Sequence, residues 1–166
     1  MNPIVLIAGT VAALALLASR KASGAELEED LSDEFWLWPV PDYKRISSAY
    51  GWRVDPLSGK ESWHAGIDIS AASGVPVFAA RSGRVVYSAF AGAQSYGERL
   101  VIDHGDGFSS TYSHLLTRLM LVGDVVEAGD LIAQVGSTGR STGPHLHLEI
   151  LIGDVAMDPL MYLEAP

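Results

Sequence analysis

Residues 145–150 alternate strictly between polar and apolar side chains, in the order His-Leu-His-Leu-Glu-Ile. Successive side chains of a β-strand point to opposite faces, so we expect a strand with His145, His147 and Glu149 on one face. The apolar residues between them would then face a core. Two imidazoles about 7 Å apart along a strand can both reach one metal site. The alternative interpretation is a pair of polar residues on a solvated strand face.

The chain from Trp36 onward has the pattern of a β protein. Short runs rich in Val and Ile are separated by Gly, Pro, Asp and Ser, as in strands joined by turns. Gly105-Asp106-Gly107 predicts a hairpin connection, and only residues 115–121 favour a helical turn. The predicted class is mostly β, a largely antiparallel β-sheet domain of short strands preceded by one N-terminal hydrophobic helix. The predicted strands are 66–69, 76–79, 83–90, 99–104, 109–114, 131–135 and 145–152.

Composition limits the possible functions. Apolar residues make up 48% of the 166 residues, enough for one domain with a real core. The net charge of −9 disfavours binding to the phosphate backbone of nucleic acids. The absence of cysteine excludes disulfides, thiolate zinc sites and cysteine nucleophiles. Any metal site must therefore use His, Asp or Glu.

The N-terminal segment is apolar. Residues 4–18 carry no charge, and counting residues 1–19 just reaches the roughly 17–25 residues that a membrane helix needs. We expect an uncleaved membrane anchor at 1–19, an acidic linker at 20–35 and a globular domain at 36–166. The alternatives are a signal peptide cleaved after Ala25 and a buried core helix.

Two further segments carry candidate metal or catalytic residues. His64 and Asp68 lie four residues apart and share one face of a helix or a strand, and the alternation of Ile67 and Ile69 favours a strand. A His and a carboxylate are ligands that suit zinc, although a simple His–Asp hydrogen bond is the alternative. His114 closes a polar strand segment, where it could be a structural residue.

These motifs and several others follow one another in an order that resembles the lysostaphin/LytM-type zinc metallopeptidases, which cut peptide bonds in bacterial peptidoglycan. The resemblance covers residues 38–163. It rests on Ile46-Ser47-Ser48, Gly51-Trp52-Arg53-Val54-Asp55-Pro56, His64-Ala65-Gly66-Ile67-Asp68, Tyr112-Ser113-His114-Leu115, Gly136-Ser137-Thr138-Gly139, Gly143-Pro144-His145-Leu146-His147 and Asp158-Pro159.

The resemblance implies roles for five residues. His64, Asp68 and His147 would bind one zinc ion per chain and leave one coordination position open, as in catalytic sites. Zinc lowers the pKa of bound water toward about 7 and polarises the scissile carbonyl. His114 and His145 would lie beside the metal as catalytic residues. Either could take a proton from the water or stabilise the oxyanion, and the sequence does not decide between them.

The predicted function is a membrane-anchored, zinc-dependent endopeptidase of peptidoglycan cross-links or stem peptides. Residues 1–19 would contact the lipid membrane, with the catalytic domain outside the cytoplasm. One alternative is a virion-associated lytic enzyme of a bacteriophage. Others are a non-catalytic module that activates another hydrolase and a structural component of an envelope or virus assembly. The sequence leaves open whether a Gly–Gly bridge or a D-Ala–diaminopimelate cross-link is cut, since loops 89–98 and 137–143 shape the pocket.

Overall fold

A computed structural model describes residues 36–164 of the chain. The predicted membrane anchor (1–19) and acidic linker (20–35) lie outside these residues. Among the residues described, no helix has the length and apolar character required to cross a membrane.

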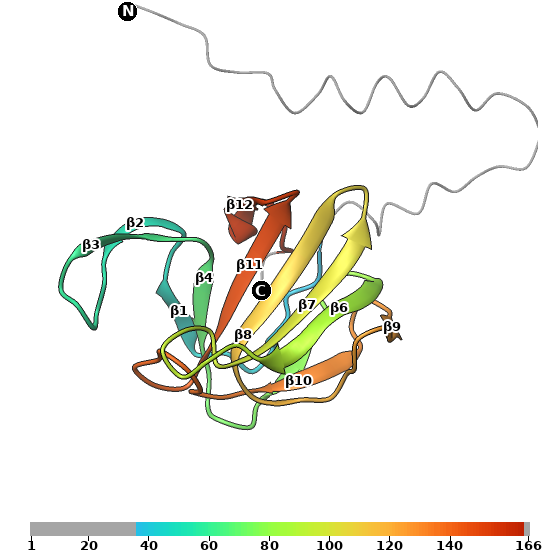
Figure 1. The fold of residues 1–166 in the computed structure, drawn as a ribbon, viewed down its shortest axis with the longest axis horizontal. Helices are drawn as coiled ribbons and strands as arrows, with labels where there is room; N and C mark the ends of the chain where they lie inside the picture. Colours follow the sequence, from blue (N-terminus) through green and yellow to red (C-terminus); the bar gives the residue numbers. More distant parts are fainter. Residues whose placement is uncertain (1–35, 165–166) are drawn as a thin grey trace, which may run out of the picture. The chain divides into compact units, whose positions relative to one another are not determined.

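The described residues form short strands and one 3-10 helix, with no α-helix among them (Figure 1). Gly, Pro and Asp residues between the Val- and Ile-rich runs keep most strands short. The elements are β1 (Arg45–Ser48), β2 (Gly51–Val54), β3 (Glu61–His64), β4 (Ile67–Ser70), β5 (Pro76–Phe78), β6 (Gly83–Phe90), β7 (Glu98–Gly105), β8 (Phe108–Arg118), β9 (Val125–Val126), β10 (Leu131–Val135), β11 (His145–Ile152), β12 (Val155–Met157) and the 3-10 helix η2 (Pro159–Met161).

Ten of the strands form one sheet. Seven of them follow the order β1-β4-β11-β8-β7-β6-β9, β12 pairs with β11, and β10 pairs with both β8 and β5. β2 and β3 form a separate two-stranded sheet that reaches away from the main sheet (Figure 1). Every strand pair is antiparallel, which confirms the predicted antiparallel β-sheet domain, while the N-terminal helix of that prediction lies outside the described residues.

Two local predictions have opposite outcomes. The hairpin at residues 105–107 is confirmed: Gly105, Asp106 and Gly107 have φ values of 78°, 51° and 82° and connect β7 to β8. The predicted helical turn at residues 115–121 is wrong, because β8 continues to Arg118. Its last residues pair with β10, with Leu115 opposite Val135. Pairing with a second strand outweighs the weak helical pattern.

The core lies on the apolar face of the central strands. Leu146, Leu148 and Ile150 of β11 are fully buried, together with Ile67 and Ile69 of β4. Burying each such side chain stabilises the fold by about 1.5–3 kcal/mol relative to its exposure. The opposite face of β11 is also enclosed, but it carries His147 and Glu149. The buried centre of the sheet therefore holds polar side chains that must find partners.

Candidate metal centre and cleft

Three potential metal ligands meet where β3, β4 and β11 come together. His64 is the last residue of β3, Asp68 lies in β4, and His147 lies in β11 directly opposite Asp68. Gly66, between His64 and Asp68, allows this approach: a β-carbon there would collide with the backbone of Leu148. The glycine in this motif is thus required by packing against β11.

The three side chains present their ligand atoms to one point. Nε2 of His64 lies 3.1 Å from Oδ1 of Asp68 and 3.0 Å from Nδ1 of His147, and the last two atoms are 2.8 Å apart. All three residues are buried. A tetrahedral ion about 2.0–2.1 Å from each ligand would space them about 3.3 Å apart. Two imidazoles and one carboxylate at these separations fit one zinc ion.

Hydrogen bonds outside this triad orient its two imidazoles. Nδ1 of His64 lies 2.8 Å from the carbonyl oxygen of Ala49, and Nε2 of His147 lies 2.9 Å from Oε1 of Glu149. An N–H on each of these nitrogens leaves a lone pair on the nitrogen that faces the triad. Carboxylates and carbonyls in this position fix the tautomer of metal-binding histidines and raise their basicity.

The carboxylates of the site remain ionised at neutral pH. Burial opposes the charge on Asp68, but when the facing nitrogens of His147 and His64 carry protons, they donate hydrogen bonds to the carboxylate and hold the pKa of Asp68 well below its usual range. Burial likewise opposes the charge on Glu149, and His147 and Arg99 outweigh it and lower the pKa of Glu149. Both groups are therefore available as anions, one toward the ligand point and one behind His147.

His114 and His145 lie beside the triad, as the resemblance implies. Their ring centroids are 4.9 Å apart, and Nε2 of His145 lies 3.6 Å from Oδ1 of Asp68. Each ring is fixed by the loop between β10 and β11. Nδ1 of His114 lies 2.8 Å from the carbonyl oxygen of Thr138, and Nδ1 of His145 lies 2.7 Å from that of Gly143. Both rings therefore keep Nε2 free for other partners.

The backbone at His114 has a left-handed φ of 60°, which is uncommon for a residue other than glycine. β8 changes partners at this residue: Ser113 is opposite His147 of β11, and Leu115 is opposite Val135 of β10. Such a conformation costs about 1 kcal/mol or more. Burial lowers the pKa of His114 to about 4, so its ring is neutral at neutral pH.

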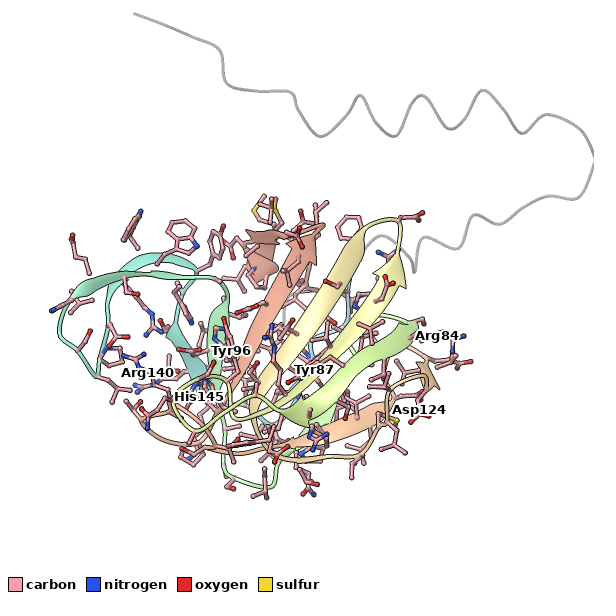
Figure 2. All side chains as sticks on the ribbon, viewed as in Figure 1. Arg84, Tyr87, Tyr96, Asp124, Arg140 and His145 are labelled. Atoms are coloured by element: carbon pink, nitrogen blue, oxygen red, sulfur yellow. The ribbon has the colours of Figure 1, made fainter. Side chains whose placement is uncertain are left out.

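These residues line a cleft of about 310 Å³. The loop between β6 and β7 contributes Tyr96, whose ring centroid lies 5.8 Å from that of His147. Figure 2 shows Tyr96, Arg140 and His145 close to one another. Tyr96, Arg53 and Arg140 were not singled out from the sequence. The only signal for Tyr96 was its place in loop 89–98.

A bidentate ion pair joins two walls of this cleft. Arg140, from the loop before β11, donates to Oδ1 and Oδ2 of Asp55 at 2.6 and 2.8 Å. Asp55 also accepts hydrogen bonds from the backbone N–H groups of Leu57 and Ser58, in the turn between β2 and β3. The β2–β3 hairpin and the loop are thus connected through one buried carboxylate.

His104, in contrast, lies away from this cleft. Its ring nitrogens contact the carbonyl oxygen of Ser82 at 2.9 Å and the hydroxyl of Ser110 at 2.7 Å. Its ring packs edge-on against Trp36 at 4.7 Å between centroids. These contacts tie β7 to its neighbours and leave no ring nitrogen for a ligand.

The sequence and the fold can be compared with known proteins. The chain is 40% identical over 118 residues to the DD-carboxypeptidase/endopeptidase Mpg of Neisseria meningitidis serogroup B, covering 71% of this chain and 27% of Mpg. The chain thus matches about a quarter of that relative's length. A zinc-containing peptidase from Vibrio cholerae superposes with a TM-score of 0.70 at 33% identity, covering 81% of this chain and 41% of that one.

The catalytic domain of lysostaphin from Staphylococcus simulans has a TM-score of 0.67 at 33% identity, and the match covers 74% of this chain and 93% of that domain. Residues 62–159 match peptidase family M23. This segment contains the ligand triad, both neighbouring histidines and most of the cleft. The chain therefore belongs to peptidase family M23.

Proposed function

We propose that this chain is a zinc-dependent endopeptidase that hydrolyses peptide bonds in bacterial peptidoglycan. The observation that carries the proposal is the convergence of His64, Asp68 and His147 on one point in the lining of a cleft. The names of the relatives, a DD-carboxypeptidase/endopeptidase and a zinc-containing peptidase, support it. His64, Asp68 and His147 would hold the ion through Nε2, Oδ1 and Nδ1.

The bound zinc ion would supply Lewis acidity, which polarises a carbonyl and makes water more acidic. Proton transfer and stabilisation of the oxyanion would be carried out by His114 and His145. His114 is neutral, and its Nδ1–H is engaged by Thr138, so Nε2 can accept a proton from the attacking water. We assign His114 as the general base on this ground.

His145 would act on the oxyanion or the leaving amine rather than on the attacking water. Its Nδ1–H donates to Gly143, and its Nε2 lies beside Asp68. When protonated, Nε2–H can donate a hydrogen bond to the developing oxyanion or pass a proton to the leaving amine. The presence of both histidines with the complete triad favours an enzyme over a non-catalytic activator module.

We further propose that the catalytic domain works outside the cytoplasm, since its substrate is there, and that residues 1–19 anchor it to the membrane. This anchor rests on the apolar sequence alone. Association with a bacteriophage particle is an alternative setting for the same activity, and it too is a prediction from the sequence.

The proposal can be tested with the purified full-length chain and isolated peptidoglycan sacculi. One preparation should contain direct diaminopimelate cross-links and the other glycine bridges. Zinc-loaded chain, the same chain with a chelator, and His147→Ala are compared, and the released fragments are identified by mass spectrometry. We expect chelator-sensitive cleavage within the peptides. No release from either preparation by a folded, zinc-loaded chain would contradict the proposal.

A further inference from the structure

Arg53 projects into the cleft from the β2–β3 hairpin. It lies opposite Ser62 in the strand pair, and His64 is two residues further along β3. Side chains alternate along strands, so Arg53, Ser62 and His64 share the face of the hairpin that looks toward the ligand triad. The Arg53 side chain is 28% exposed and lines the cleft.

The three arginines near the triad differ in how they are paired. Arg140 has both arms of its guanidinium on Asp55. Arg99 lies over the ring of Tyr96 at 4.3 Å and is also close to Glu149. Its side chain is thus held between those two residues.

Within the described residues Arg53 has one ion-pair partner, Oδ2 of Asp68 at 3.7 Å. Among residues 36–164 its guanidinium makes no hydrogen bond. A guanidinium is a planar fork that matches a carboxylate with two parallel hydrogen bonds. In Arg53 this fork remains available to a ligand in the cleft.

The charge of the site also favours an anionic ligand. The chain as a whole carries −9, yet Arg53 and Arg99 balance Asp68 and Glu149 around the triad. Arg140 and Asp55 balance each other. A divalent ion at the triad would therefore leave the cleft net positive within an acidic protein. Such a cleft concentrates substrates of opposite charge.

We propose that Arg53 binds a free carboxylate of the substrate peptide next to the scissile bond. The enzyme then selects acidic cross-links, such as those that contain diaminopimelate with a free carboxylate, over uncharged glycine bridges. This inference rests on the proposed function and specifies its substrate class. Arg53 is a specificity-determining residue that nothing in the histidine motifs reveals.

The test uses two cross-linked peptides that differ in one group, a free carboxylate or a carboxamide on the diaminopimelate residue. The full-length chain is assayed as wild type, Arg53→Gln, Arg53→Lys and Arg84→Gln. Arg84 is a matched control, since it is exposed on β6, donates to the carbonyl of Gly123 and lies far from His145 (Figure 2). kcat, KM and bound zinc are measured for each.

We expect the wild type to favour the free carboxylate by about tenfold or more, mainly through KM. Arg53→Gln should lower kcat/KM for that substrate roughly ten- to hundredfold, the range for one charged hydrogen-bonded pair. It should lower kcat/KM for the carboxamide no more than about threefold. Arg53→Lys should be intermediate, because lysine keeps the charge without the fork. Arg84→Gln should match the wild type.

Four outcomes would overturn the inference. Equal losses on both peptides in Arg53→Gln, or loss of zinc from that variant, would show that Arg53 acts by positioning Asp68. Equal cleavage of both peptides by the wild type would remove the carboxylate preference and leave the proposed function standing. Cleavage of neither peptide by zinc-loaded wild type would overturn the inference together with the proposed function.

Discussion

One half of the cleft, which we call the strand half, consists of His64, Asp68, His147 and Glu149. These residues belong to β3, β4 and β11, and the backbone pairing of the strands sets their spacing. The other half, called here the loop half, consists of His114, His145, Tyr96 and Arg140. His114 and His145 belong to β8 and β11, but their rings are hydrogen-bonded to carbonyl groups of the loop between β10 and β11. Tyr96 and Arg140 lie in the loops between β6 and β7 and between β10 and β11.

The two halves differ in which part of the backbone would have to move to shift their side chains. A shift of Asp68 relative to His147 would require β4 to slip against β11 in the buried sheet. The loop half is held by a few hydrogen bonds between loops, such as Glu98 N–H to Thr138 Oγ1 at 2.9 Å and Arg140 N–H to the Ser95 carbonyl at 2.7 Å. The metal site can thus stay constant while the loops adapt to different substrates.

The largest effect is expected in the strand half, for His147→Ala. Two remaining ligands cannot hold a catalytic zinc ion, so zinc and activity should be lost together, by about a thousandfold or more in kcat/KM. Metal analysis and the cleavage assay on one preparation measure both quantities. His104→Gln is the control and should keep its zinc. Stoichiometric zinc in His147→Ala would show that the ligand assignment is wrong.

His114→Ala tests whether a change in the loop half can lower turnover while the metal site of the strand half stays intact. The variant should keep its fold and its zinc, because His114 does not contribute to the triad. Its kcat should fall by about 10²–10⁴, the usual contribution of a general base. Undiminished turnover, measured with the cross-linked peptides at saturating concentration, would remove His114 from the mechanism.

Glu149→Gln should have a smaller effect, because Glu149 acts on the strand half through its hydrogen bond to the ligand His147. Gln keeps an acceptor for Nε2–H of His147 but removes the charge that raises the basicity of the ring. Zinc affinity should fall by about 10–100-fold, while excess zinc restores most activity. Competition with a chelator of known affinity measures the dissociation constant. An unchanged constant would mean that Glu149 does not tune the metal site.

The smallest effect concerns the ion pair that joins the loop half to the hairpin. Hydrogen bonds from Arg140 hold the pKa of Asp55 well below its usual value near 3.8. Because the pKa of Asp55 is lower in the folded chain than in the unfolded chain, its carboxylate stabilises the fold at pH values above the unfolded-state pKa. This contribution is lost as the pH falls from the unfolded-state pKa toward the folded-state pKa. Urea midpoints should therefore fall less between pH 6 and pH 3 in Asp55→Asn than in the wild type. Identical falls would show that the pair does not contribute.

The strand half was largely predictable from the sequence. The alternation around His145 and His147 correctly places β11, and the resemblance brings His64 and Asp68 to the same point. Such patterns can be recognised because every second side chain of a strand lies on the same face, so polar and apolar residues alternate along the sequence. The register that sets Asp68 opposite His147 is a long-range pairing and leaves no local mark in either segment.

The loop half was not predictable in the same way. Tyr96 and Arg140 lie in Gly- and Ser-rich loops, whose conformation depends on contacts with each other. The kink at His114 arises where β8 leaves β11 for β10, so no residue near it signals the change. The short strands β1, β2, β3, β9 and β12 were also missed, since two to four residues carry too little periodicity.

The central claim is that the strand half holds one zinc ion, and its most direct test is anomalous scattering at the zinc edge from crystals of the zinc-loaded chain. We expect one peak per chain, about 2.0–2.2 Å from Nε2 of His64, Oδ1 of Asp68 and Nδ1 of His147. A peak bound instead by His114 and His145, or no peak at the triad of a chain that cleaves peptidoglycan, would contradict the claim.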